Sequence, residues 1–80
     1  MPTVFCERGF NFFFYSNECS PREPVHIHVR KDRAEAKFWL NPVATLAYNR
    51  GYDARTLREL RVIVETNRHL IERTWDEFFD

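Results

Sequence analysis

Two histidines separated by one residue are the feature of this sequence that most directly suggests chemistry. His26 and His28 lie in the alternating segment Val25 to Arg30. Residues two apart on an extended strand project to the same side, about 6.5 to 7 Å apart along the strand. Two imidazoles placed in this way suit a single transition metal such as zinc, provided that a further ligand joins them. The sequence therefore predicts a metal site or a catalytic site on this strand.

The loop before the histidines contains the candidates for the further ligand. Glu18, Cys19 and Glu23 belong to this loop, which is tethered to the same strand and offers carboxylates and a thiolate. We name His26, His28, Glu18 and Cys19 as the metal-site candidates.

The same two histidines also suit catalysis without a metal. Because histidine is the side chain that titrates near neutral pH, a pair can divide the general base and general acid roles of RNA cleavage. His26 and His28 are therefore the catalytic candidates of a hydrolase or RNase, with Arg30 or Lys37 on the phosphate. The alternative without chemistry is that both histidines simply occupy the polar face of an amphipathic strand.

The alternation of apolar and polar residues predicts the strand that carries the histidines and a partner strand. Val25 to Arg30 places its apolar residues on one face and both histidines on the other. Glu35 to Leu40 alternates again, and the intervening turn suits a hairpin. The expected register pairs Arg30 with Glu35, His28 with Lys37 and His26 with Trp39.

Two further regions are expected to complete the sheet. Val4 to Cys6 and Phe10 to Tyr15 flank a glycine turn and predict a second hairpin. Val43 to Tyr48 is taken as a short strand, although Asn41-Pro42 would also suit the start of a helix. Ser16 to Pro24 contains prolines and alternating charges and is predicted to be a loop.

One long helix is predicted from Ala54 to Phe79, with Asp53 as its N-cap. Its apolar residues recur at intervals of three and four and form one broad stripe. A helix of about 26 residues spans roughly 39 Å, which is longer than a small sheet. Its aromatic end is therefore expected to overhang and to contact a second chain. The predicted fold class is α+β, a small antiparallel sheet of three to five strands packed against one long C-terminal helix.

Length and composition limit the classes of protein to which this chain can belong. Eighty residues are expected to form a single domain, residues 1–80, because so short a chain cannot be divided into two cores. Hydrophobic residues make up 44% and aromatic residues 16% of the chain, which excludes a disordered protein. Twelve basic and twelve acidic residues cancel, so neither a generally basic nucleic-acid surface nor a polybasic membrane anchor is expected.

No membrane segment and no secretion signal are expected. The longest apolar stretch, Phe12 to Tyr15, is far too short to span a bilayer, and the N-terminus has no apolar signal segment. We therefore expect a cytoplasmic protein in which Cys6 and Cys19 are free thiols rather than a disulfide.

The face that carries the histidines also collects aromatic and cationic side chains. Such a face suits the stacking of single-stranded RNA, but we favour a face that is covered by the long loop of this chain or by another protein chain. The end of the predicted helix adds further aromatic residues. The partner-binding candidates are Phe13, Tyr15, Arg30, Lys37, Trp39, Trp75 and Phe78.

The order of these segments resembles a small prokaryotic family of unknown function. The resemblance rests on Gly9-Phe10, Ser16-Asn17-Glu18, Pro24 to Val29, Ala36 to Leu40, Asn49 to Tyr52 and Trp75 to Phe79. It covers nearly the whole chain, and the combination is more specific than any single motif.

The resemblance also shows where this chain departs from the family. In that family the histidine strand usually follows two prolines, and a further histidine often follows the Ser-x-Glu segment. Here Val25 replaces the second proline and Cys19 stands where the extra histidine is common. A three-histidine metal site carried over from the family would therefore need Cys19 as the substitute ligand.

Members of that family are often encoded beside a second small protein, in pairs that resemble toxin–antitoxin modules. The resemblance therefore implies a partner protein more firmly than it implies a reaction. Our leading interpretation is an interaction component of such a pair, and the alternative is the hydrolase or RNase that uses His26 and His28. RNA and a second copy of the chain are the other partners considered.

Overall fold

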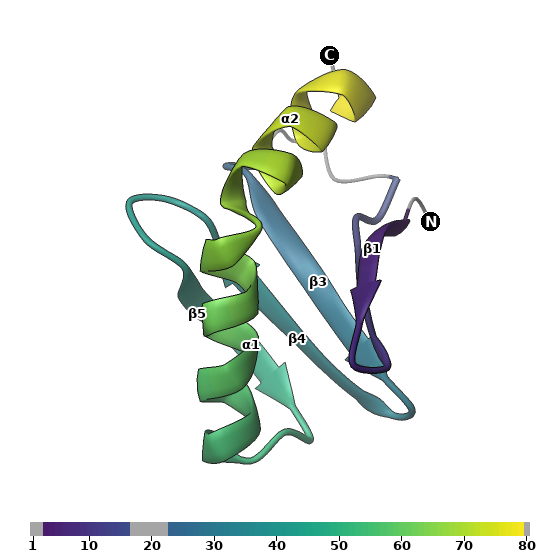
Figure 1. The fold of residues 1–80 in the computed structure, drawn as a ribbon, viewed down its shortest axis with the longest axis vertical. Helices are drawn as coiled ribbons and strands as arrows, with labels where there is room; N and C mark the ends of the chain where they lie inside the picture. The colour runs from purple at the N-terminus through teal and green to yellow at the C-terminus, as the bar shows by residue number, and fades with distance from the viewer. Residues whose placement is uncertain (1–2, 17–22, 80) are drawn as a thin grey trace.

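The computed structural model describes residues 3–16 and 23–79 of the chain. It contains an antiparallel sheet of five strands, in which each strand lies beside its neighbours in the sequence. Two helices follow the sheet and cover one of its faces (Figure 1). The strands are β1 (Thr3–Glu7), β2 (Phe10–Phe13), β3 (His26–Lys31), β4 (Ala34–Trp39) and β5 (Thr45–Arg50), and the helices are α1 (Ala54–Thr66) and α2 (Arg68–Phe79). The predicted α+β class is confirmed.

The register of β3 and β4 is the one that the alternation of residues predicts. The observed pairs include Arg30 with Glu35, His28 with Lys37 and His26 with Trp39. In β2, Phe13 lies opposite His28 and therefore on the same side of the sheet. The sequence thus correctly predicted which side chains of the central strands share the face opposite the helices.

The edge strand β5, which begins later than predicted, contains an extra residue that decides where its side chains point. Tyr48 lies opposite Lys37 and Leu46 lies opposite Phe38, so Ala47 has no counterpart of its own in β4. Residues two apart would share one face of a regular strand. The bulge instead places Leu46 on the helix-covered face and Tyr48 on the opposite face.

The helical part of the chain is two helices, and the prediction of a single long helix is wrong. Asn67 separates α1 from α2 because its backbone leaves the helical conformation, with φ −103° and ψ 18°. Its side-chain amide donates a 2.8 Å hydrogen bond to the Ile63 carbonyl, which also accepts the Asn67 backbone N–H at 3.1 Å. Such a side chain competes with the regular hydrogen-bond ladder of a helix. Arg68, the first residue of α2, then donates to the Leu40 carbonyl and ties the second helix to the end of β4.

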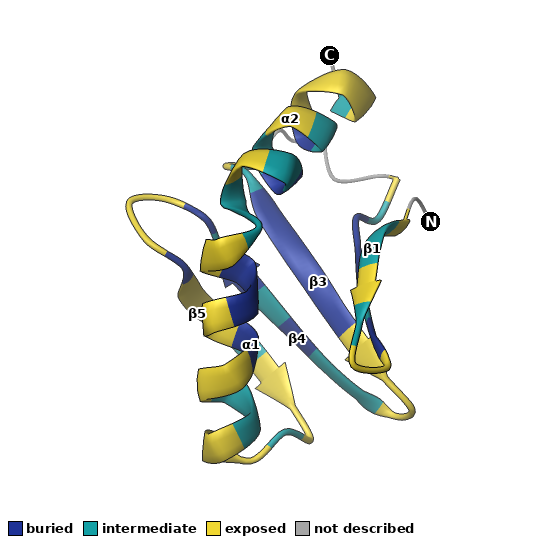
Figure 2. Cartoon of the chain, viewed as in Figure 1, coloured by how far each residue is buried: buried dark blue, intermediate teal, exposed yellow. Residues whose placement is uncertain are grey.

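The hydrophobic core lies between the two helices and one face of the sheet (Figure 2). Alternate residues of the central strands meet the apolar sides of both helices there. The buried members include Phe12, Phe14, Ile27, Val29, Phe38, Leu40, Leu60, Val64, Ile71 and Trp75. The predicted core face of the sheet is confirmed. Within the described part of the chain, neither helix has the length and apolar character needed to cross a membrane.

The aromatic end of α2 packs onto the sheet, contrary to the predicted overhang. Trp75 is buried, with its ring centroid 5.2 Å from that of Phe14 and 4.9 Å from that of His26. The Phe79 ring lies 4.2 Å from the Trp75 ring. Phe78 is 43% exposed. Because of the kink between the helices, α2 follows the end of the sheet. Among the aromatic residues at the end of α2, Phe78 is the exposed one.

We predict that the two glycines differ in the cost of an alanine substitution. Both have a positive φ, +82° at Gly9 and +102° at Gly51, where an L side chain is strained. A Cβ at Gly51 would lie 3.2 Å from the Ala34 Cβ, whereas at Gly9 it would lie 3.4 Å from the flexible Lys31 side chain. Gly51→Ala should lower the free energy of unfolding by about 2 kcal/mol, and Gly9→Ala by about 1 kcal/mol. Urea denaturation measures both, and equal costs would contradict the difference in available space.

Candidate functional site

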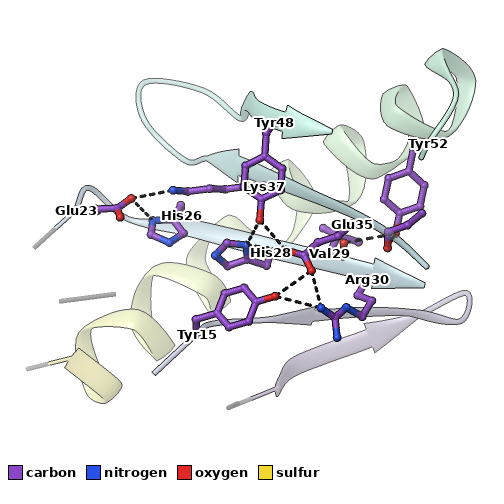
Figure 3. Close-up of polar contacts among 11 residues, drawn as sticks. Tyr15, Glu23, His26, His28, Val29, Arg30, Glu35, Lys37, Tyr48 and Tyr52 are labelled. Atoms are coloured by element: carbon purple, nitrogen blue, oxygen red, sulfur yellow. Dashed lines mark hydrogen bonds and ion pairs between the residues drawn. The ribbon is translucent and has the colours of Figure 1, made fainter. Parts of the chain in front are cut away.

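The sheet face opposite the helices carries a set of polar and aromatic side chains that we call the polar face (Figure 3). Alternation along three antiparallel strands, together with the bulge in β5, brings these side chains to one side of the sheet. The polar face consists of Phe13 from β2, Tyr15 just after it, His26, His28 and Arg30 from β3, Glu35, Lys37 and Trp39 from β4, and Tyr48 from β5. Both histidines predicted to be catalytic belong to it.

The Glu35 carboxylate is the centre of the polar face. Its Oε1 accepts hydrogen bonds from the Arg30 guanidinium at 2.7 Å and from the Tyr15 hydroxyl at 2.9 Å. Its Oε2 accepts from the Tyr48 hydroxyl at 2.6 Å and lies 3.7 Å from Nδ1 of His28. The Glu35 side chain is only 13% exposed. One carboxylate therefore joins side chains from β3, from β5 and from the segment after β2.

The hydrogen bonds keep Glu35 ionised. Burial by itself would raise the pKa of Glu35, but the donors of Tyr48, Arg30 and Tyr15 outweigh it and hold the pKa below its ordinary value. Burial and the bond to Glu35 raise the pKa of Tyr48 well above its ordinary value, so its hydroxyl keeps the proton. The bond to Glu35 also raises the pKa of Arg30. The centre of the polar face therefore holds a carboxylate and a guanidinium beside a neutral Tyr48.

His28 is oriented by Tyr48. The Tyr48 hydroxyl lies 3.2 Å from Nδ1 of His28 and donates its only proton to Glu35. The hydroxyl oxygen therefore accepts from His28, which places the imidazole proton on Nδ1 and the lone pair of the neutral ring on Nε2. The rings of Phe13 and Tyr15 pack on the imidazole at centroid distances of 5.5 Å and 4.5 Å. His28 is only 3% exposed as a result.

His26 is held in a similar way by a backbone carbonyl. Nδ1 of His26 lies 2.9 Å from the Pro24 carbonyl oxygen, which can only accept, so Nδ1 carries the proton of the neutral ring. The ring is fully buried, with the rings of Trp39 and Trp75 at centroid distances of 5.4 Å and 4.9 Å. The two imidazoles lie 5.1 Å apart and nearly perpendicular.

Lys37 and Glu23 close one end of the polar face. Nζ of Lys37 lies 2.8 Å from the Glu23 carboxylate and 4.2 Å from the ring centroid of Trp39. The same carboxylate oxygen of Glu23 lies 3.9 Å from Nδ1 of His26. Lys37 therefore already contacts a carboxylate and an indole ring of its own chain, those of Glu23 and Trp39. These contacts argue against the predicted role of Lys37 in holding a phosphate.

Both histidines have the orientation of imidazoles that bind a metal or transfer a proton. In each ring, Nδ1 donates to an oxygen, which fixes the ring and assigns the lone pair to Nε2. Within the part of the chain that the structure describes, no three His, Cys, Asp or Glu side chains form a group that could hold a metal ion. Of the three candidates for a further ligand, Glu18 and Cys19 lie outside the described residues. The carboxylate of Glu23 lies 3.9 Å from Nδ1 of His26, which is not the nitrogen with the lone pair. The metal site therefore stays a prediction about His26, His28, Glu18 and Cys19.

The predicted partner-binding residues fall into a buried, a half-buried and an exposed group. Phe13 is fully buried and Trp75 is 3% exposed, so packing inside the protein occupies both rings. Arg30 is 45% exposed and Phe78 is 43% exposed. The half-buried members are Tyr15, Lys37 and Trp39. A partner can reach Arg30 and Phe78 directly, whereas Phe13 and Trp75 support the sheet from within.

Sequence reasoning missed the two residues that organise the polar face. It paired Glu35 with Arg30 across the hairpin, and this pairing was the signal that a carboxylate lies among the candidate residues. It did not identify Glu35 as the common acceptor. Tyr48 could not be assigned to this face from the alternation of residues, because its direction depends on the bulge at Ala47.

Comparison with known proteins identifies a family. Residues 9–76 match the family described as a domain of unknown function, DUF4160, and the chain belongs to that family. No curated protein and no solved structure matches the chain. Membership agrees with the predicted small family of unknown function.

We predict that Glu35 links the stability of the fold to pH. Its folded-state pKa lies below its ordinary value, so the ionised carboxylate stabilises the folded state above the unfolded-state pKa of about 4.3. This stabilisation is lost as the pH falls through the lower pKa of the folded state. Glu35→Gln should therefore lower the free energy of unfolding at neutral pH. It should also flatten the decline between about pH 5 and pH 3, as measured by urea denaturation.

Glu77→Gln is the matched control, because Glu77 lies at an exposed position of α2. It should leave both the stability and its pH dependence close to those of the wild type. If the wild type and Glu35→Gln lose stability in parallel on acidification, Glu35 is not the linked group.

Proposed function

We propose that this domain of unknown function is the interaction component of a two-protein pair of the toxin–antitoxin type. Membership of the DUF4160 family leaves the activity open. The resemblance to chains that are often encoded beside a second small protein supports a partner more strongly than a reaction. The partner proposed is the small protein encoded by the adjacent reading frame.

The observation that favours binding over catalysis is the burial of both histidines. His26 is fully buried and His28 is 3% exposed, and rings of the same chain pack on each imidazole. A substrate would have to displace those rings before it reached an imidazole nitrogen. In contrast, Val62 is 63% exposed and Phe78 is 43% exposed. Aromatic side chains such as Phe78 are enriched at the centres of protein interfaces, and exposed apolar surface is what a partner can bury.

One specific observation favours the second candidate function, a hydrolase or RNase. Each histidine directs Nδ1 to an oxygen acceptor, as imidazoles that bind metals or transfer protons do. Arg30 is 45% exposed beside the Tyr15 hydroxyl and would meet an anionic substrate first. His26 and His28 would then be the catalytic pair, with or without a transition metal.

We predict that the wild-type chain forms a complex with the protein encoded by the adjacent frame, measured by co-purification and size-exclusion chromatography with light scattering. The double variant His26→Asn, His28→Asn keeps a donor near each Nδ1 position and removes Nε2. It should bind the partner within about threefold of the wild type, because neither ring reaches the surface. Failure of the wild type to form any complex would contradict the proposed function.

We further predict that the same double variant separates binding from chemistry. Metal content of untagged protein, by mass spectrometry, and cleavage of single-stranded RNA are measured for the wild type and for the variant. His69→Asn is the matched control, since His69 is the exposed histidine of α2 and belongs to neither candidate pair. If the function is to bind a partner protein, we expect neither bound metal nor RNA cleavage in any of the three proteins. RNA cleavage that only the double variant loses would establish the hydrolase instead, and near-stoichiometric metal lost with it would show that the histidines hold that metal.

A further inference from the structure

Apart from Phe78, the large apolar side chains that are exposed in the described part of the chain lie on β5, just before it or on α1. Val43 is 55% exposed, Leu46 is 40% exposed and Val62 is 63% exposed. Leu46 lies on the helix-covered face of β5, and Val43 comes just before the strand. A hollow of about 360 Å³ lies between this region and α1, and it is lined by Val43, Ala44, Arg61, Val62, Glu65 and Thr66.

β5 is also an open edge of the sheet. Its neighbour is β4, so within the described chain no strand lies along its other side. Thr45–Arg50 contains neither proline nor lysine, and the features that could protect this edge are the Ala47 bulge and Arg50 at the end of the strand. The strand stays paired with β4 on both sides of the Ala47 bulge. An extended segment can therefore add to this edge through backbone hydrogen bonds.

α1 runs back alongside β5 and brings positive charge to the same region. The chain passes directly from β5 into α1, and the Glu65 carboxylate accepts the backbone N–H of Ala44 just before β5 (Figure 1). Arg50, Arg58 and Arg61 are exposed, and no carboxylate oxygen of the described residues lies within 4.0 Å of their side-chain nitrogens. Arg58 and Arg61 lie on α1, on the helix side of the β5 edge, whereas Arg50 lies opposite Glu35 and over the Tyr48 ring, on the polar-face side of the same edge. An acidic ligand along the edge can therefore meet an arginine on either side of the sheet.

We propose that β5 binds an extended, acidic segment of the partner protein as a sixth strand. The inference rests on the proposed function and names the place where the partner docks. The segment's backbone would hydrogen-bond along β5, and one apolar side chain would fill the hollow beside Val62. Its carboxylates would meet Arg58 and Arg61 on the helix side of the edge and Arg50 on the polar-face side. A second copy of this chain fits less well, because it would bring the same arginines to the edge.

Hydrogen exchange on the complex with the adjacent-frame protein tests this docking directly. The slowed amides should lie in Thr45–Arg50, where exchange should fall by at least about tenfold relative to the free chain. The amides of β1, on the opposite edge of the sheet, are the internal control and should change by less than about twofold.

A pair of matched variants tests the surface beside the strand. Val62→Glu removes the apolar group and adds a like charge next to the acidic segment, so it should weaken the complex by at least about tenfold in titration calorimetry. Ala54→Glu adds the same charge at an exposed position in the first turn of α1 and should stay within about twofold. Circular dichroism establishes that both variants fold.

The outcomes separate this inference from the proposed function. A complex that leaves exchange in β5 unchanged, or that tolerates Val62→Glu as well as Ala54→Glu, overturns the docking site and leaves the proposed function standing. Absence of a complex with the wild type overturns both. Exchange in β5 that slows in the free chain as its concentration rises assigns the edge to a second copy and overturns the partner segment.

Discussion

The ionised Glu35 carboxylate is the constraint on which the second face of the sheet depends. Two helices cover one face of the five-stranded sheet. No helix covers the opposite face in the described chain, and side chains of the sheet itself bury much of that face. Tyr15, Arg30 and Tyr48 reach Glu35 from different parts of the chain, and their bonds offset the cost of burying its charge. The same bonds hold the rings of Tyr15 and Tyr48 beside His28, and these rings help to bury the imidazole.

The two faces of the sheet are joined at one end by His26. Its ring belongs to the polar face, yet it lies 4.9 Å from Trp75, which is part of the core formed with the helices. Trp75 in turn packs against Phe14 and Phe79. This contact depends on the kink at Asn67, because the kink directs α2 across the end of the sheet. The polar face and the hydrophobic core therefore form one continuous packed unit at this end of the sheet.

This packing separates the chemistry-bearing residues from the open surface. The histidines, which look catalytic in the sequence, are enclosed by Phe13, Trp39 and Trp75. The open surface lies instead at β5 and α1, where apolar side chains, an unpaired strand edge and arginines occur together. The proposed binding function needs a stable interior and an accessible edge, and these lie in different places in the fold. The hydrolase alternative would require the polar face to open before a substrate could enter.

The sequence by itself determined the α+β class, the β3–β4 register and the faces of the central strands, because residue alternation in strands and periodicity in helices are local properties. It also determined that Arg30 and Glu35 face each other. Only the tertiary structure decided the features that depend on competition between local and distant contacts. The Asn67 side chain divides the predicted helix, the Ala47 bulge turns Tyr48 towards Glu35, and the folded α2 buries Trp75 against His26. Burial, which distinguishes a supporting histidine from an accessible one, is a property of all these contacts together and cannot be derived from spacing alone.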